Sequence, residues 1–180
     1  MEEYSETPTI DFGRLRIGFP CISPEGGAHL ANAAAVCLGD RGHSAGSSMD
    51  VTGSYNSRFS LAWATIDDRV RREWGDLQDA TEDGACGLAI LLIDALTEYH
   101  VVLRSRKGSG FDYFLGLKAE DLFQGSARLE VSGILSGDAK LIDQRVKQKI
   151  RQTDRSDQSK LPAFIVVVEF SGPTAAVVKK

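Results

Sequence analysis

Two single carboxylates interrupt segments that otherwise have the apolar character of buried strands. Asp112 stands among aromatic residues in GSGFDYFLG, which covers Gly108–Gly116, and Glu130 stands in the short phrase RLEVSG. An isolated charge is costly to bury unless a cation or hydrogen-bond donors compensate it. Carboxylate oxygens are also the ligands that Mg²⁺ prefers. The placement of these two acids therefore indicates a possible metal site.

Two runs of basic residues lie on either side of these acids in the sequence, and they suggest contact with phosphate. The run RSRK contains Arg104, Arg106 and Lys107, and Lys147 lies in a second basic run, RVKQKIRQ. Alternation along a strand would point Arg104 and Arg106 to the same face. Arginine forks match the geometry of phosphate oxygens. A solvated surface is the alternative interpretation of both runs.

The elements that would position these residues follow in a clear order. An apolar helix is expected through Ala85–Leu96, capped by Asp79 or Thr81, with Glu82 in its first turn. A β-hairpin follows, made of YHVVLRSRK, the turn KGSG and the return strand FDYFLG. ARLEVSGIL is the third strand, with Glu130 and Ser132 on one face together with Arg128.

The last predicted elements are a helix and a buried strand. Asp138 is expected to cap a helix that runs through about Gln152, with an apolar stripe on one side. The segment DRSDQSKLP reads as a loop, and FIVVVEF as a strand in the centre of the sheet. The closing segment GPTAAVVKK reads as a short tail.

The N-terminal part gives weaker signals. Residues 1–9 are polar and are expected to be frayed, and a strand is expected through Leu15–Phe19. GGAHLANAAAVCLGDRGH predicts a helix. A turn-rich stretch then covers Gly46–Asn56, before a strand over Arg58–Ile66 and a short charged helix in DDRVRREWGDLQ.

The order helix, strand, strand, strand, helix, strand resembles the PD-(D/E)XK, or restriction-endonuclease-like, nuclease superfamily over roughly residues 80–171. The resemblance implies an α/β (α+β) fold: a central mixed β-sheet flanked by helices, with an αβββαβ core and an N-terminal αβ extension. It also implies a metal site built from an acid on the first helix, an Asp on the second strand and an (E/D)-x-K on the third. Glu82, Asp112 and Glu130 would then bind Mg²⁺ or Mn²⁺.

One residue departs from this family pattern. Ser132 occupies the place of the third-strand lysine, and a serine supplies neither the positive charge nor the ammonium donors. Lys107 or Lys147 could supply the charge from another element. Otherwise the site is degenerate, and the domain binds rather than cuts.

Ordinary structural roles exist for each acid. Asp112 could accept hydrogen bonds from turn N–H groups, and Glu130 could pair with Arg128, Arg104 or Arg106. Glu82 could act only as an acid near a helix N-terminus. These interpretations stay open at the level of the sequence.

The composition places only broad limits on the number of domains, the partners and the cellular compartment. The chain has 180 residues, a net charge of −4 and three cysteines without a CxxC spacing. We expect one domain over 1–180, with an extension over 1–75 and a nuclease-like core over 76–180. The acidic balance neither requires nor excludes nucleic acid. We expect a cytoplasmic protein without signal peptide or membrane span, with a nucleic acid or a protein as its partner.

Three functions follow from these observations. The first is a metal-dependent nuclease acting on DNA, or on RNA, with Asp112, Glu130 and Lys107 as catalytic residues. Arg104, Arg106, Lys107 and Lys147 would contact the nucleic acid. The second is a non-catalytic module of the same fold that serves as a binding, immunity or assembly subunit. The third is an unrelated domain that binds a small ligand, in which Asp112 would not lie beside Glu130.

Overall fold

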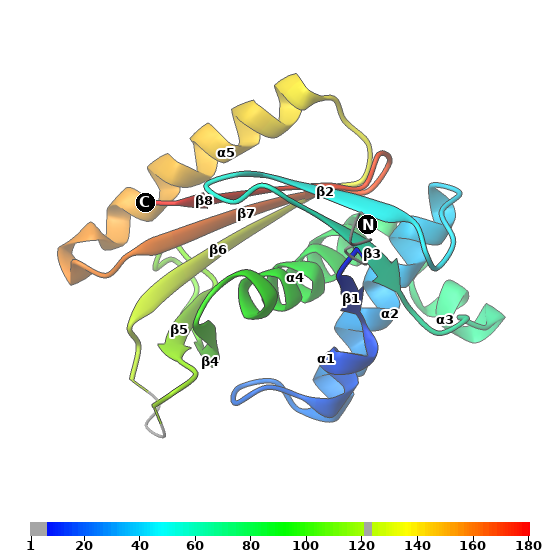
Figure 1. Cartoon of the computed structure of the whole chain (residues 1–180), viewed down its shortest axis with the longest axis horizontal. Coiled ribbons are helices and arrows are strands. Elements are labelled where there is room, and N and C mark those ends of the chain that lie inside the picture. Colours follow the sequence, from blue (N-terminus) through cyan, green and yellow to red (C-terminus); the bar gives the residue numbers. More distant parts are fainter. Residues whose placement is uncertain (1–6, 121–123) are drawn as a thin grey trace, which may run out of the picture.

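The computed structural model describes residues 7–120 and 124–180. These residues form one mixed sheet of eight strands with five α-helices and a short 3-10 helix, which confirms the expected fold class (Figure 1). The strands are β1 Thr9–Asp11, β2 Ser48–Gly53, β3 Ser57–Ala62, β4 Tyr99–Arg104, β5 Tyr113–Leu117, β6 Ala127–Ile134, β7 Ala163–Glu169 and β8 Thr174–Lys179. The helices are α1 Gly13–Ile17, α2 Pro24–Asp40, α3 Asp68–Glu73, α4 Leu77–Leu96 and α5 Ala139–Thr153, followed by η1 Asp154–Ser159.

The sheet has the strand order β1-β3-β2-β8-β7-β6-β5-β4. Strands β4, β5 and β6 form an antiparallel meander, and β6 pairs in parallel with β7 after the crossover through α5. Strand β8 is antiparallel to β7 and parallel to β2. The N-terminal strands and the later strands therefore belong to a single sheet.

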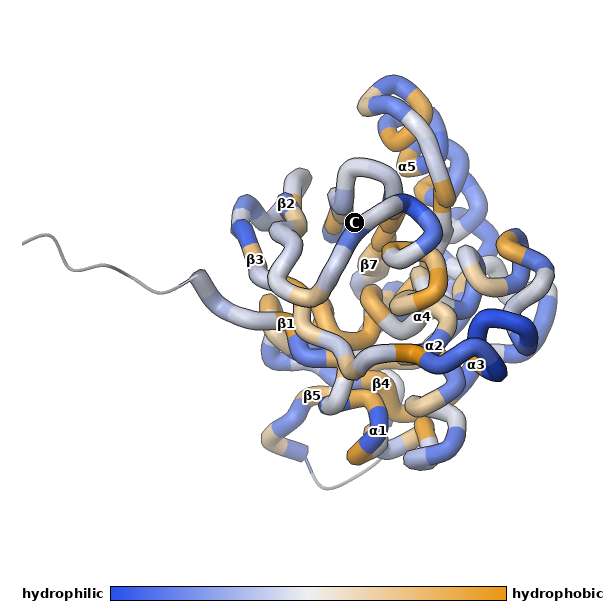
Figure 2. Tube along the Cα trace, turned by 90° about the vertical axis from the view of Figure 1, so that its right-hand side faces the viewer, coloured by the Kyte–Doolittle hydropathy of each residue, from blue (hydrophilic) through white to orange (hydrophobic). Residues whose placement is uncertain are grey.

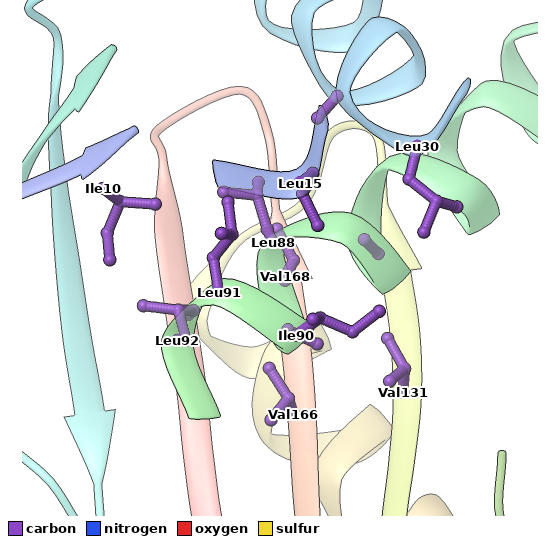
Figure 3. Packing of buried hydrophobic residues seen from close by; sticks show 14 of the residues in the cluster. Ile10, Leu15, Leu30, Leu88, Ile90, Leu91, Leu92, Val131, Val166 and Val168 are labelled. Carbon is purple, nitrogen blue, oxygen red and sulfur yellow. The ribbon is translucent and has the colours of Figure 1, made fainter. Parts of the chain in front are cut away.

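Helices cover the sheet on both faces. Helix α5 lies on one face, and α2 and α4 lie on the other (Figure 1). The larger core lies between the sheet and α4, where side chains of α4 fill the space between Val166 of β7 and Leu15 of α1 (Figure 3). A smaller core joins Val146 of α5 to Ile165 and Val167 of β7.

The central helix α4 is enclosed by protein, as its apolar sequence predicted. A β-carbon on Gly84 would lie only 2.8 Å from the backbone nitrogen of Ala34, so the two helices α2 and α4 nearly touch there. Apolar residues follow α4 and β7 through the interior, whereas α3 is mainly hydrophilic (Figure 2). No helix within the described residues has the length and apolar character needed to cross a membrane.

The core elements largely follow the predictions. Strand β6 and the fully buried β7 match the expected third and last strands, and β7 lies inside the sheet between β6 and β8. Helix α5 begins after Asp138, whose Oδ1 accepts a hydrogen bond from Leu141 N at 2.8 Å. Helix α2 and the short helix α3 also match their predicted segments.

The predicted strand at Leu15–Phe19 is wrong. Its first part belongs to helix α1, in which Leu15 is fully buried and Ile17 is 73% exposed. Residues two apart share a face in a strand, so this difference in burial fits a helix instead. Helix α2 packs closely against α1. A β-carbon on Gly27 of α2 would lie only 1.8 Å from the carbonyl oxygen of Leu15.

Four short elements were missed. Strand β1 begins at Thr9, inside the stretch expected to be frayed, while residues 1–6 lie outside the described part. The turn-rich stretch contains β2, and the expected tail forms β8. The loop DRSDQSKLP contains the 3-10 helix η1.

Helix α4 also begins earlier than predicted. Asp76 is its N-cap, and its Oδ1 accepts a hydrogen bond from Gln78 N at 2.8 Å. Neither Asp79 nor Thr81 serves as the cap, because Thr81 lies within the helix and donates its hydroxyl to the Leu77 carbonyl. Glu82 consequently lies in the second turn rather than the first.

Candidate functional site

The site begins where the sheet opens between β5 and β6. The two strands pair only as far as Tyr113 and Leu129, while β6 continues to Ile134. Asp112 lies at this fork. Its backbone N–H donates to the Leu129 carbonyl at 2.8 Å, and its Oδ2 accepts from Val131 N at 2.8 Å. The Asp112 carboxylate thus accepts the hydrogen bond from Val131 N–H that a backbone carbonyl of a paired strand would otherwise accept. This bond fixes the position of the carboxylate at the fork.

Glu130 is buried immediately beside this fork. It faces α5 and is only 1% exposed. Its Oε1 accepts hydrogen bonds from Lys149 Nζ at 2.5 Å and from Gln152 Nε2 at 2.9 Å. Its Oε2 is buried with no hydrogen-bond partner among the described residues. One oxygen of Glu130 is therefore fixed in place. The other has no N–H donor among the described residues, and a hydrogen bond to the carboxyl group of Asp112 is one of the causes that raise the pKa of Glu130.

The environment of Glu130 moves its pKa toward neutrality. Burial is the largest cause, and the nearby charge of Asp112 adds to it, so that the pKa of Glu130 rises to about 7. The hydrogen bond from Lys149 and its charge act in the opposite direction. Asp112 and Glu130 are thus close enough for their charges to interact, as paired carboxylates in a reactive site would be.

Helix α5 supplies the cations of the site. Arg145, Lys149 and Gln152 are spaced four and three residues apart and therefore share one side of the helix. Arg145 Nη1 donates to Ser132 Oγ at 2.8 Å, and Lys149 reaches Glu130 two residues earlier on the same strand. Helix α5 therefore places two positive charges beside Ser132 and Glu130.

A cavity of about 300 Å³ opens at the fork. Two acids and a thiol from α4, residues of β6 and the hairpin, and two cations of α5 line it. The lining residues are Glu82, Asp83, Cys86, Arg104, Asp112, Val131, Ser132, Gly133, Arg145 and Lys149. Burial, together with the neighbouring carboxylates, raises the pKa of Cys86 to about 12, so this thiol stays protonated near neutral pH.

The structure brings some of the predicted site residues together and separates others. Glu82, Arg104 and Asp112 line the cavity, and Glu130 lies next to it. Lys107 and Lys147 lie outside its lining. The Lys147 side chain is 62% exposed and pairs with Asp143 at 2.7 Å.

The hairpin also differs from its expected form. Strand β4 ends at Arg104, so Arg106 falls in the turn and does not share a strand face with Arg104. Arg104 instead lies near the ring of Tyr113, with 5.7 Å from its Cζ to the ring centroid.

The alternative structural partners of Glu130 are not used. Arg128 is 3% exposed and donates to the Leu161 carbonyl, to Ser156 and to Asp157. Its hydrogen bonds to Ser156 and Asp157 connect η1 to strand β6, and it does not pair with Glu130. The Asp112 carboxylate does bind a backbone N–H, although that group belongs to β6 and not to the hairpin turn.

The donor set has the chemistry for a hard cation but does not form a complete cage. Within residues 7–120 and 124–180, no three Asp, Glu, His or Cys side chains are grouped closely enough to hold a metal ion. The partnerless Oε2 of Glu130 and the neighbouring carboxylate of Asp112 are oxygen ligands of the type that Mg²⁺ accepts, with water completing its shell. The fit is therefore to an ion that keeps most of its waters.

The sequence contained a signal for the residues that were missed. Arg145, Lys149 and Gln152 form a polar stripe beside the apolar stripe of Ile142, Val146 and Ile150. A charged stripe that adjoins the buried side of a helix lies at the edge of the core, where it can reach the sheet.

Comparison of the chain with protein-family models, with curated proteins and with solved structures found no significant match.

Proposed function

We propose that this chain is a metal-dependent nuclease that hydrolyses phosphodiester bonds in DNA. The observation that carries the proposal is the pair formed at the fork by the buried Glu130 and the half-buried Asp112, with Lys149 bonded to Glu130. The order from α4 through β4, β5, β6 and α5 to β7, together with its strand pairing, supports the resemblance to restriction-endonuclease-like proteins.

The acids would hold the metal, and the cations would hold the phosphate. Asp112 and the partnerless oxygen of Glu130 are the proposed ligands, with Glu82 facing the same cavity from α4. A bound Mg²⁺ would polarise the phosphoryl oxygen and acidify a water molecule. Arg145 and Arg104 line the cavity and would bind the non-bridging oxygens of the phosphate.

Lys149 would take the role of the lysine that Ser132 replaces. Its ammonium lies 2.5 Å from Glu130 Oε1 and lines the cavity, so it is placed to stabilise the charge that develops during attack on the phosphate. Gln152 would act as a positioning residue, because its amide holds the same oxygen of Glu130 at 2.9 Å.

A cleavage assay tests this proposal. Purified protein is incubated with single-stranded and double-stranded DNA in Mg²⁺, in Mn²⁺ or in EDTA. We expect metal-dependent cleavage that Asp112→Asn lowers by about 10²-fold or more, because the variant keeps the bond to Val131 N–H but loses the charge. Asp143→Asn, at an exposed site on α5, is the matched control and should retain full activity.

Wild-type protein that cleaves none of these substrates in either metal would contradict the proposal. Equal cleavage by wild type and Asp112→Asn would contradict it as well.

The second candidate is a module of this fold that binds nucleic acid without cutting it. The ion pair between Lys149 and Glu130 favours it, because that pair already neutralises one proposed metal ligand. This function predicts binding that EDTA leaves unchanged and that Arg145→Ala weakens. The cleavage assay and a binding assay in EDTA together separate the two candidates.

A further inference from the structure

A second cavity continues from the fork along β6. Its volume is about 450 Å³, and it shares Glu82, Gly133 and Arg145 with the first cavity. Its remaining lining is mostly uncharged and includes Leu77, Gln78, Thr81, Ile134, Leu135, Ser136 and Leu141. A phosphate bound at the fork would therefore have an apolar hollow directly beside it.

The floor of this second cavity is an unpaired strand edge. Even-numbered residues of β6 bond to the β7 side, as the Arg128 N–H and the Ile134 carbonyl do. Odd-numbered residues face the side where β5 has ended, as the Leu129 carbonyl and the Val131 N–H show. By this alternation the N–H and C=O of Gly133 point to the open edge, where no described strand pairs with them.

The position of Gly133 keeps this edge close to α4. A β-carbon there would lie 2.3 Å from the carbonyl oxygen of Thr81, so only glycine allows the strand to approach the helix so closely. The cavity thus combines apolar walls with one backbone donor, one backbone acceptor and the amide of Gln78. Apolar walls with hydrogen-bonding groups at one edge are complementary to a flat heterocycle with polar edges.

A strongly acidic region also adjoins the cavity at the fork. A third cavity shares Glu82 and Asp83 with the first and is otherwise lined by His29, Trp74 and further acids, namely Glu73, Asp76 and Asp79. Such a charge would repel a phosphodiester backbone. A nucleic-acid strand that leaves the fork is therefore directed toward the cavity along β6, whose lining has one acid and one arginine.

We infer that the cavity lined by Leu135, Leu141 and Gln78 binds one unpaired nucleobase next to the phosphate held at the fork. This inference rests on the proposed function and specifies its substrate as a single strand, or a duplex with a base turned out of the helix. A stacked base pair does not fit a hollow whose polar groups lie at a strand edge between two helices.

The test measures binding in EDTA, so that cleavage plays no part. The probes are a short oligothymidylate and an oligomer of the same length and charge in which tetrahydrofuran replaces each nucleoside base. Wild type should bind the thymidylate more tightly, on the order of tenfold. Leu141→Ser should reduce this ratio to about two or less and leave the affinity for the abasic probe unchanged.

Two further variants keep the result interpretable. Leu135→Ser, in the loop after β6, should lower the same ratio even if Leu141→Ser folds poorly. Leu103→Ser, which replaces a 57% exposed leucine on β4, is the control and should keep the wild-type ratio.

Equal affinity of wild type for the two probes would overturn the base site while leaving the phosphate site intact. Absence of binding to either probe would contradict this inference, and metal-dependent cleavage by the same protein would show that the nuclease proposal survives without it. Binding with base preference but without cleavage in the metal assay would support the inference and contradict the nuclease.

Discussion

At the scale of single residues, the site depends on a carboxylate that lowers the stability of the fold. Glu130 is buried with a pKa of about 7, compared with 4.5 for an exposed glutamate. The folded state therefore binds this proton more tightly than the unfolded state does. The resulting stabilisation is complete below about pH 4.5 and is lost as the pH rises through about 7.

This linkage predicts the behaviour of Glu130→Gln. The variant carries no charge at any pH and keeps an oxygen for the Gln152 amide, so it should be more stable than wild type at pH 8, by about 3 kcal/mol. At pH 4.5 the two proteins should unfold at nearly the same urea concentration. Urea titrations at both pH values measure the difference, and an equal difference at the two pH values would contradict the buried charge.

Two lysines of α5, Lys147 and Lys149, give a second prediction at this scale. Lys149→Ala should lower metal-dependent cleavage by about 10²-fold, because it removes the ammonium beside Glu130. Lys147→Ala is a matched control on the same helix, since its side chain pairs with Asp143 away from the cavity. Initial rates of cleavage at fixed metal concentration measure both variants. A larger loss in Lys147→Ala would place the reactive cation elsewhere.

The sequence indicated the acids of the site better than the cations. Asp112 and Glu130 stand out because each is a single charge in an apolar segment. Lys149 stands out only when the orientation of α5 is known, because a shift of two residues turns a side chain by about 200° around a helix. Lys147 and Lys149 thus face opposite directions, and the basic run alone does not distinguish them.

At the scale of elements, the fork and α5 together create the site. Strand β6 carries Arg128, Glu130 and Ser132 on its α5 face, and each contacts a residue on α5 or just after it. The start of α5 therefore determines which side chains of the helix reach the strand.

Removal of the α5 cap tests the importance of this positioning. Asp138→Ala removes the oxygen that accepts from Leu141 N and should lower the free energy of unfolding by about 1 kcal/mol. Asp143→Ala removes only an exposed ion pair and should cost less than about 0.5 kcal/mol. Urea denaturation compares the two variants. Equal stability of both would show that Asp138 does not hold the helix.

Two of the strands that the sequence did not predict, β2 and β8, were missed for the same physical reason. Strand β2 has only Met49 and Val51 as buried residues, and β8 was read as a tail. They pair with each other across more than a hundred residues of sequence, and this contact joins two hairpins, β2 with β3 and β7 with β8, that lie far apart in the chain. Sequence periodicity indicates local structure, whereas a short strand is stabilised by partners far away in the chain.

At the scale of the whole molecule, the N-terminal part and the core share one sheet and one interior. Strand β2 pairs with β8, and α2 packs on α4 at Gly84. The apolar residues of α4 therefore need α2 to exclude water.

A fragment that contains only residues 76–180 should not fold on its own. Its loss of β1 to β3 and of α2 would expose one edge of β8 and much of α4. We expect no cooperative unfolding transition by circular dichroism. A cooperative transition would show that the core is independent of residues 1–75.

The central claim is that Asp112 and Glu130 together form a site for a divalent cation, and a calorimetric titration with Mn²⁺ tests it most directly. We expect binding by wild type that weakens about tenfold per pH unit below pH 7, because Glu130 must lose its proton first. Asp112→Asn and Glu130→Gln should each abolish the binding, and Asp143→Asn should retain it. Absence of Mn²⁺ binding by wild type at pH 8, or equal binding by Asp112→Asn, would contradict the account.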